Sequence, residues 1–481
     1  MSTQPARPVA SLPKDANLQH LKHQAKDLQK AFQSGVAAAR ERVKTAKPKL
    51  ARSSKLLLSD AQFVIAREYG FESWPKLKHF VEGDVPKLLI NAVNANDVKA
   101  VHALLRKHPE LKSRINEPLF GFDAPAIVAK SGQREMVDVL LEAGADINAM
   151  SKWWAGGFGV LHSHTSRGEH GQYLVSRGAR VDAHAAANLN LADALEKLID
   201  ADSAVVNQRG PDGMVPLHMA ATPAIAKLLL DRGAEVDTRD IDHESTPAQY
   251  AIPHRPEVCR YLLNRGAQPD IFMACVLGDV ALVTKLIKDD PSCLQHRIAK
   301  GQFVTTKSEG QHIYVYNLGY TQTPLTLAHK HGHSRLLNFL LKHCSLKERF
   351  FHACSTADQK AVNAILKKEP FIAATLTADE ASAIADAAWN NDLAAVRTML
   401  EAGFPVDARG IHQSTPLDRA AIRGYIAIVE LLLEHGASLD VKNEFGGTPL
   451  RASKWGAENF RDPKGDYPAV IARLTRAGAK S

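Results

Sequence analysis

Residues 415–442 read TPLDRAAIRGYIAIVELLLEHGASLDVK, and this stretch decides the fold. Thr415 suits a helix N-cap, and Pro416 suits the first helical position, where no backbone donor is needed. Gly424 separates this short helix from a second one, whose apolar residues recur at core-facing spacing. Gly436 is expected to end the second helix in the left-handed conformation. Such a helix pair cannot bury its apolar face alone, so it has to stack on similar pairs.

The same pattern repeats along the chain. A Gly-Ala pair follows an apolar helical run six times, with steps of 33 or 34 residues between neighbours such as 144 and 178 or 233 and 266. Thr-Pro opens a unit four times, and the last two, at 415 and 448, are again 33 residues apart. A fixed period of this length predicts a solenoid in which each unit contacts its neighbours.

These units resemble the ankyrin repeat, as do VPLHMAA at 215–221 and LLLDRGAEVD at 228–237. The resemblance covers residues 84–481 in roughly twelve units of differing fidelity. It implies an all-α solenoid whose first helices line a concave face. Two insertions interrupt it. Residues 297–322 contain the alternating HIYVYNLGY, which predicts a projecting β-hairpin, and residues 453–468 lengthen the last unit.

Residues 1–83 form a separate region, predicted to be a basic helical extension. They carry 15 Lys and Arg against 7 Asp and Glu, whereas the remainder carries 45 of each. The extension resembles one associated with bacterial ankyrin-repeat proteins, a resemblance that implies no chemistry. A basic run between Arg40 and Lys55 suggests nucleic acid, but it lacks interleaved aromatic residues. We therefore favour a solvated helix end and linker, and expect no nucleic-acid partner.

The composition excludes several classes of protein. No stretch approaches the roughly 18 consecutive apolar residues of a membrane span, and the opening residues resemble no secretory signal. The five scattered cysteines predict reduced thiols in a cytoplasmic protein. No histidine or cysteine set has zinc spacing, and no phosphate loop or dinucleotide fingerprint is present. We expect neither a metal nor another cofactor.

Five titratable residues depart from the repeat consensus and are candidates for acid–base chemistry. His164 replaces a small alanine, and Glu244 lies where the loop normally carries glycine. Asp242 and His243 precede Glu244 on the same loop, and His412 occupies the matching loop of a later unit. A carboxylate beside an imidazole suits general acid–base catalysis. The same residues are common on solvated polar turns, which is the interpretation we favour.

Aromatic residues give the strongest surface signal, because large exposed aromatic side chains normally mark binding sites. The resemblance places some on the concave face, others in the loop after a Gly-Ala pair, and one in the first insertion. Packing into an irregular unit is the alternative for the two adjacent tryptophans. The candidates are Trp153, Trp154, Tyr250, Tyr316, Trp389 and Trp455.

Two functions follow from these observations. The favoured one is a binding protein that holds a protein partner on its concave face and loop fingers, as the resemblance implies. The second is a small-ligand-binding protein or enzyme on the same scaffold, acting on a sugar or polar ring compound. Such an enzyme would be a metal-independent lyase or hydrolase that uses the acid–base candidates. An open groove favours a protein, and a closed pocket with converging polar groups favours a small ligand.

Overall fold

The computed structural model describes Leu12 and residues 18–50, 53, 55–82, 85–252, 254–306 and 311–480. Within these ranges the chain consists of α-helices and 3-10 helices joined by loops, and no β-strand is present. The predicted all-α class is therefore confirmed. No helix in the described part of the chain is both long and apolar enough to cross a membrane.

The chain divides into two compact units. Unit 1 comprises Met1–Asp242 and Arg260–Arg265, and unit 2 comprises His243–Cys259 and Gly266–Ser481. The helices of unit 1 are α1 (Leu18–Gln33), α2 (Ala37–Ala46), η1 (Pro48–Leu50), α3 (Leu58–Glu68), α4 (Trp74–Glu82), α5 (Val85–Asn94), α6 (Val98–Lys107), η2 (Pro109–Arg114), η3 (Gly121–Asp123), α7 (Ala126–Ala129), α8 (Arg134–Glu142), η4 (His164–Ser166), α9 (Glu169–Ser176), α10 (Ala183–Asn188), α11 (Ala192–Ala201), η5 (Ser203–Asn207), η6 (Pro211–Gly213), α12 (Pro216–Met219) and α13 (Pro223–Asp231).

Unit 2 continues the succession of short helices, and helix α15 contains residues of both units. These helices are α14 (Pro247–Ala251), α15 (Pro256–Asn264), α16 (Ile271–Leu277), α17 (Val280–Asp289), η7 (Pro291–Gln295), η8 (Gly301–Phe303), α18 (Ile313–Asn317), α19 (Pro324–Lys330), α20 (Ser334–His343), α21 (Leu346–Ser355), α22 (Gln359–Leu366), η9 (Ile372–Thr375), α23 (Ala378–Ala381), α24 (Ala383–Trp389), α25 (Leu393–Glu401), η10 (Ile411–Gln413), α26 (Pro416–Arg423), α27 (Ile426–Glu434), α28 (Pro449–Asn459) and α29 (Tyr467–Arg476).

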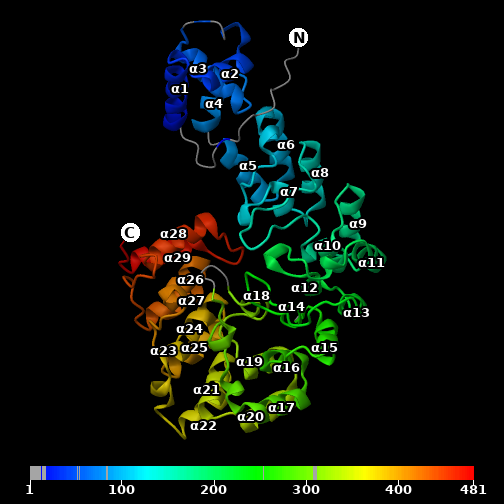
Figure 1. Ribbon diagram of the computed structural model, residues 1–481. Coiled ribbons are helices and arrows are strands. Elements are labelled where there is room, and N and C mark those ends of the chain that lie inside the picture. The colour runs from blue at the N-terminus through cyan, green and yellow to red at the C-terminus, as the bar shows by residue number, and fades with distance from the viewer. Residues whose placement is uncertain are drawn as a thin grey trace. The chain divides into compact units, whose positions relative to one another are not determined.

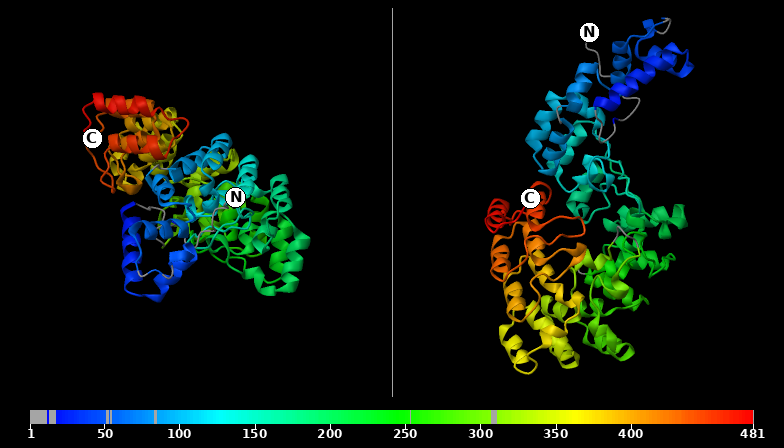
Figure 2. Two further views of the ribbon diagram at one scale, coloured as in Figure 1. Left: turned by 90° about the horizontal axis from the view of Figure 1, so that it is seen from above. Right: turned by 90° about the vertical axis from the view of Figure 1, so that its left-hand side faces the viewer.

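The repeat chemistry of the sequence produces this helix succession. Helices α14, α19, α26 and α28 each follow a threonine N-cap and start with proline. Thr415, for example, accepts a hydrogen bond from the Asp418 backbone N–H at 3.1 Å. Gly436 ends α27 with φ +80°, the predicted left-handed conformation. Within unit 2, the first helices α24, α26 and α28 pack side by side (Figures 1 and 2) and bury apolar residues between them and the second helices.

The β-hairpin expected within residues 297–322 is wrong for the residues that the structure describes there. Residues 313–317 instead form helix α18. Ile313, Tyr314 and Val315 are consecutive and all buried, whereas a half-buried strand would expose every second side chain. The His312 ring caps this helix by accepting the Tyr314 backbone N–H at 3.2 Å. Residues 307–310 of the insertion lie outside the described residues.

The N-terminal helices α1–α4 pack on one another within unit 1. Several cations of the basic run have partners among these helices. Arg42 forms an ion pair with Glu68 at 2.8 Å, and Lys47 forms one with Asp60 at 2.7 Å. These contacts account for part of the basic run without an external partner.

Candidate functional site

Three loop tips share an unusual backbone conformation. Each has two consecutive residues with positive φ, as in the tight turns that favour Asn-Gly or Asp-Gly. Asp212–Gly213 has φ values of 52° and 71° and fits that preference. Phe122–Asp123, with 61° and 47°, and His412–Gln413, with 60° and 53°, do not. A bulky aromatic residue in this region is strained, and such strain concentrates at functional sites.

In unit 1 the strained tip belongs to an aromatic cluster that we name the finger patch: Phe122, Trp153, Trp154 and Phe158. The Phe122 ring lies edge-on to Trp153, with 5.0 Å between centroids, and 6.1 Å from Phe158. The Trp153 and Trp154 rings are 6.2 Å apart. Phe122 is 62% exposed and Trp154 is 47% exposed, so the cluster presents apolar surface to solvent.

Backbone contacts between neighbouring loops hold the finger patch in place. The Lys152 N–H donates to the Asp123 carbonyl at 3.0 Å, and the Asp212 N–H donates to the Gly156 carbonyl at 3.2 Å. Gly156 has φ +137°, and a Cβ there would lie 2.0 Å from the Gly210 carbonyl oxygen. Only glycine fits this close approach without backbone movement.

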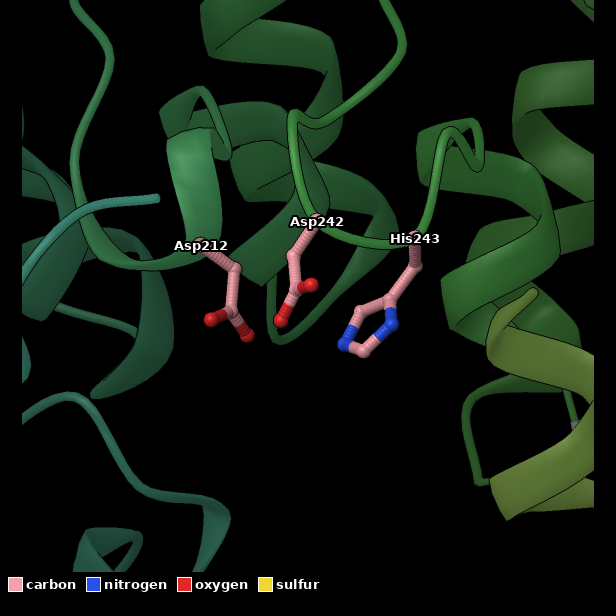
Figure 3. Close-up of side chains that lie close together, drawn as sticks. All are labelled: Asp212, Asp242 and His243. Carbon is pink, nitrogen blue, oxygen red and sulfur yellow. The ribbon is translucent and has the colours of Figure 1, made fainter. Parts of the chain in front are cut away.

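A buried carboxylate lies beneath the patch. The Trp153 indole N–H donates to Asp242 Oδ2 at 3.1 Å, and Asp242 is 4% exposed. The Asp242 backbone N–H in turn donates to the Asp212 carbonyl at 3.2 Å. Figure 3 shows the two aspartate side chains next to each other, with carboxylate oxygens within 4.8 Å. His243, also labelled there, follows Asp242 in the chain.

In unit 2 the insertion contacts two of the predicted acid–base residues, His243 and Glu244. His243 Nδ1 lies 2.8 Å from the Gln311 carbonyl oxygen, and its ring lies 5.2 Å from Tyr316 and 6.0 Å from Tyr250. Glu244 accepts the Thr306 backbone N–H at 2.9 Å. His243 and Glu244 therefore help to hold the insertion against their own loop.

The remaining acid–base candidates lie in separate surroundings. His412 contacts the Glu444 carboxylate, and its ring is 5.3 Å from that of Phe445. His164 is exposed at the start of η4 in unit 1. A catalytic role for these candidates stays a prediction.

The two tryptophans of the C-terminal repeats differ in environment. Trp389 is packed: the guanidinium carbons of Arg419 and Arg423 lie 4.8 and 4.9 Å from its ring centroid, and Phe460 lies edge-on at 5.4 Å. Trp455 on α28 is 51% exposed. Trp455 thus offers open surface, whereas Trp389 is held in a cation–aromatic cluster.

A groove of about 580 Å³ lies in unit 2. Residues 318–322 of the insertion form one wall, and residues of α19, α21, α24 and α25 form the others. Asp386 lines it, and burial raises the pKa of its carboxyl group, which accepts the Thr321 hydroxyl at 2.6 Å. The volume matches that of small-molecule sites.

Sequence reasoning missed Phe122 and the C-terminal arginines. The only local signal for Phe122 was that GFDAP at 121–125 has no Asn-Gly or Asp-Gly for the turn. Arg419 and Arg423, four residues apart on α26, were recognisable as one helix face. Their contact with Trp389 depends on helix packing, which the sequence pattern does not specify.

Comparison with known proteins identifies part of the chain as ankyrin repeats. A family model described as ankyrin repeats (3 copies) matches residues 183–273 and 350–443. The B-cell lymphoma 3 protein homolog of Mus musculus is 27% identical over 269 residues, 54% of this chain and 52% of that protein. The E3 ubiquitin-protein ligase KEG of Arabidopsis thaliana is 21% identical over 347 residues, 66% and 20% respectively.

A shorter match is stronger in identity. The ankyrin repeat and SOCS box protein 16 of Mus musculus is 37% identical over 87 residues, 18% of this chain and 19% of that protein. The chain therefore spans about half the length, or less, of these relatives. All three come from an animal or a plant, so they give no support to the expected bacterial association.

Proposed function

We propose that this chain, whose residues 183–273 and 350–443 match ankyrin repeats, binds a protein partner through the face formed by the first helices of its repeats and through the loops between repeats. Ankyrin repeats commonly mediate protein–protein binding. An interface of ordinary size buries ~800 Å² on each side, an area that several neighbouring repeats supply.

The observation that carries this proposal is the finger patch. Phe122 keeps a bulky ring at a turn position that favours Asn or Gly, and leaves that ring largely in solvent. Backbone strain and exposed apolar surface both make phenylalanine unfavourable at this position in the protein without a partner. A partner that covers the ring accounts for both, because aromatic anchors supply much of the binding energy at protein interfaces.

Capture from lysate with the full chain as bait tests the proposal. Trp154→Ala is expected to recover less of the partner, whereas Phe371→Ala, which removes a ring 82% exposed outside the loop tips, is expected to recover as much as the parent. Equal recovery by both variants and the parent would overturn the role of the patch. Equal loss in both variants would also overturn it, since exposed rings in general would then be responsible.

The groove of unit 2 supports a second candidate function, the binding of a small polar ring compound such as a sugar. Its volume and the insertion at its wall carry this candidate. A thermal-shift screen with pooled glycosides tests it, with Ala387→Trp as the variant that fills the groove. A shift that persists in Ala387→Trp, or the absence of any shift, would contradict this candidate.

A further inference from the structure

We propose that the finger patch binds a cationic side chain of the protein partner, the ammonium group of a lysine or the guanidinium group of an arginine. This inference rests on the proposed function, because it specifies the chemistry of the group that the patch receives. It is argued from the aromatic rings, the carboxylate behind them and the charges around them.

The rings of the patch provide the surface that a cation prefers among apolar groups. A cation within about 6 Å of a ring centroid is attracted by the negative face of the ring, most strongly by tryptophan. The ring centroids of Phe122 and Trp153 are 5.0 Å apart, and those of Trp153 and Trp154 are 6.2 Å apart. A cation between two such rings lies within about 6 Å of both centroids. One cationic group can therefore contact more than one of these rings.

The contact between Trp153 and Asp242 strengthens this attraction. A carboxylate that accepts the indole N–H places negative charge at the ring edge and increases electron density in the ring, which makes both faces more negative. Asp242 is buried, so water screens its charge weakly. The 3.1 Å hydrogen bond thus couples a buried negative charge to an aromatic ring at the molecular surface.

The charges nearby favour a cation over an anion. Asp123 is exposed at the loop tip beside Phe122, and the Asp212 carboxylate lies within 4.8 Å of that of Asp242. Lys152 is the one basic residue in residues 120–124 and 150–158, and the His243 ring has a nitrogen within 4.8 Å of the Asp212 and Asp242 carboxylates. An acidic partner group would be repelled by the exposed carboxylate of Asp123, and an uncharged apolar group would gain nothing from this negative charge.

Fluorine NMR on the full chain tests the inference, with its five tryptophans replaced by 5-fluorotryptophan. The Trp153→Phe and Trp154→Phe variants assign the two patch resonances. The probes are Nα-acetyl-lysine methyl ester, which keeps its side-chain ammonium group, and the neutral Nα-acetyl-norleucine methyl ester. We expect saturable shifts of the patch resonances with the lysine ester, binding about fivefold weaker for norleucine, and unchanged Trp74 and Trp455 resonances.

A charge variant and a matched control sharpen the test. Asp242→Asn keeps an oxygen acceptor for the indole but removes the negative charge, and is expected to weaken lysine-ester binding about threefold. Asp200→Asn, which removes an exposed carboxylate on α11 of the same unit, is expected to leave it unchanged. Equal affinity for the two esters, or no saturable shift, would overturn the inference. The proposed function would still stand if Trp154→Ala recovered less of the captured partner, so the two failures are distinguishable.

Discussion

Converting the strained tip to the sequence that its turn prefers is expected to separate stability from binding. The double substitution Phe122→Asn with Asp123→Gly places Asn-Gly at φ 61° and 47°. Relief of left-handed strain is worth about 1–2 kcal/mol for Phe122. The loss of the edge-on contact with Trp153 costs about 0.5–1.5 kcal/mol. The flexibility of the new glycine costs about 0.5–1 kcal/mol. The net change in the free energy of unfolding should therefore lie between a loss of about 1.5 kcal/mol and a gain of about 1 kcal/mol.

Binding should respond differently. An aromatic anchor at an interface contributes about 2 kcal/mol or more, so partner capture is expected to fall more than about tenfold. Calorimetry measures the stability effect, for which 1 kcal/mol corresponds to about 2–4 °C in a unit of this size. Destabilisation beyond about 2 kcal/mol would show that Phe122 serves the fold. Unchanged capture by a stable variant would show that the exposed ring has no binding role.

Three further substitutions test the fold. Gly436→Val is expected to cost more than about 1 kcal/mol because φ +80° suits a β-branched residue poorly; an unchanged melting temperature would refute the helix-end assignment. Gly156→Ala, whose Cβ would lie 2.0 Å from the Gly210 carbonyl oxygen, should cost about 2 kcal/mol or more, which urea denaturation measures. Burial lowers the pKa of His352 to about 4; stability should fall by roughly 3 kcal/mol as pH drops from 6.5 towards 4, because the unfolded state binds the proton first. His352→Leu should flatten that dependence, and an unaltered slope would contradict it.

The helix pairs could be predicted from the sequence because each unit carries its own start and end signals. Thr415 caps α26, and Gly436 adopts the left-handed conformation, as expected from residues a few positions away. These features are local, so neighbouring sequence specifies them. The structure of the insertion could not be predicted from neighbouring residues in this way. Tyr314 is completely buried and its hydroxyl donates to Asp270 at 2.7 Å, so long-range packing overrode the alternating pattern that predicted strands.

The candidate site was predictable only in part. Trp153 and Trp154 were identified as adjacent tryptophans in a loop, but the contact of Trp153 with Asp242 joins residues 89 positions apart. Phe122 was missed because no local rule places a phenylalanine in a left-handed turn. Its conformation follows from the short turn closed by the Phe120–Ala124 bridge. The site therefore consists largely of features that arise between repeats, where sequence periodicity is uninformative.

The size of the finger patch limits what it can do alone. The exposed parts of Phe122 and Trp154 amount to about 200 Å², worth about 5 kcal/mol if fully covered at ~25 cal/mol per Å². Association itself costs about 4 kcal/mol or more in lost translational and rotational freedom. The patch therefore cannot hold a partner tightly by its apolar surface. A stable complex must also use other loops or the first-helix face, which implies that Trp154→Ala should weaken binding while contacts elsewhere persist.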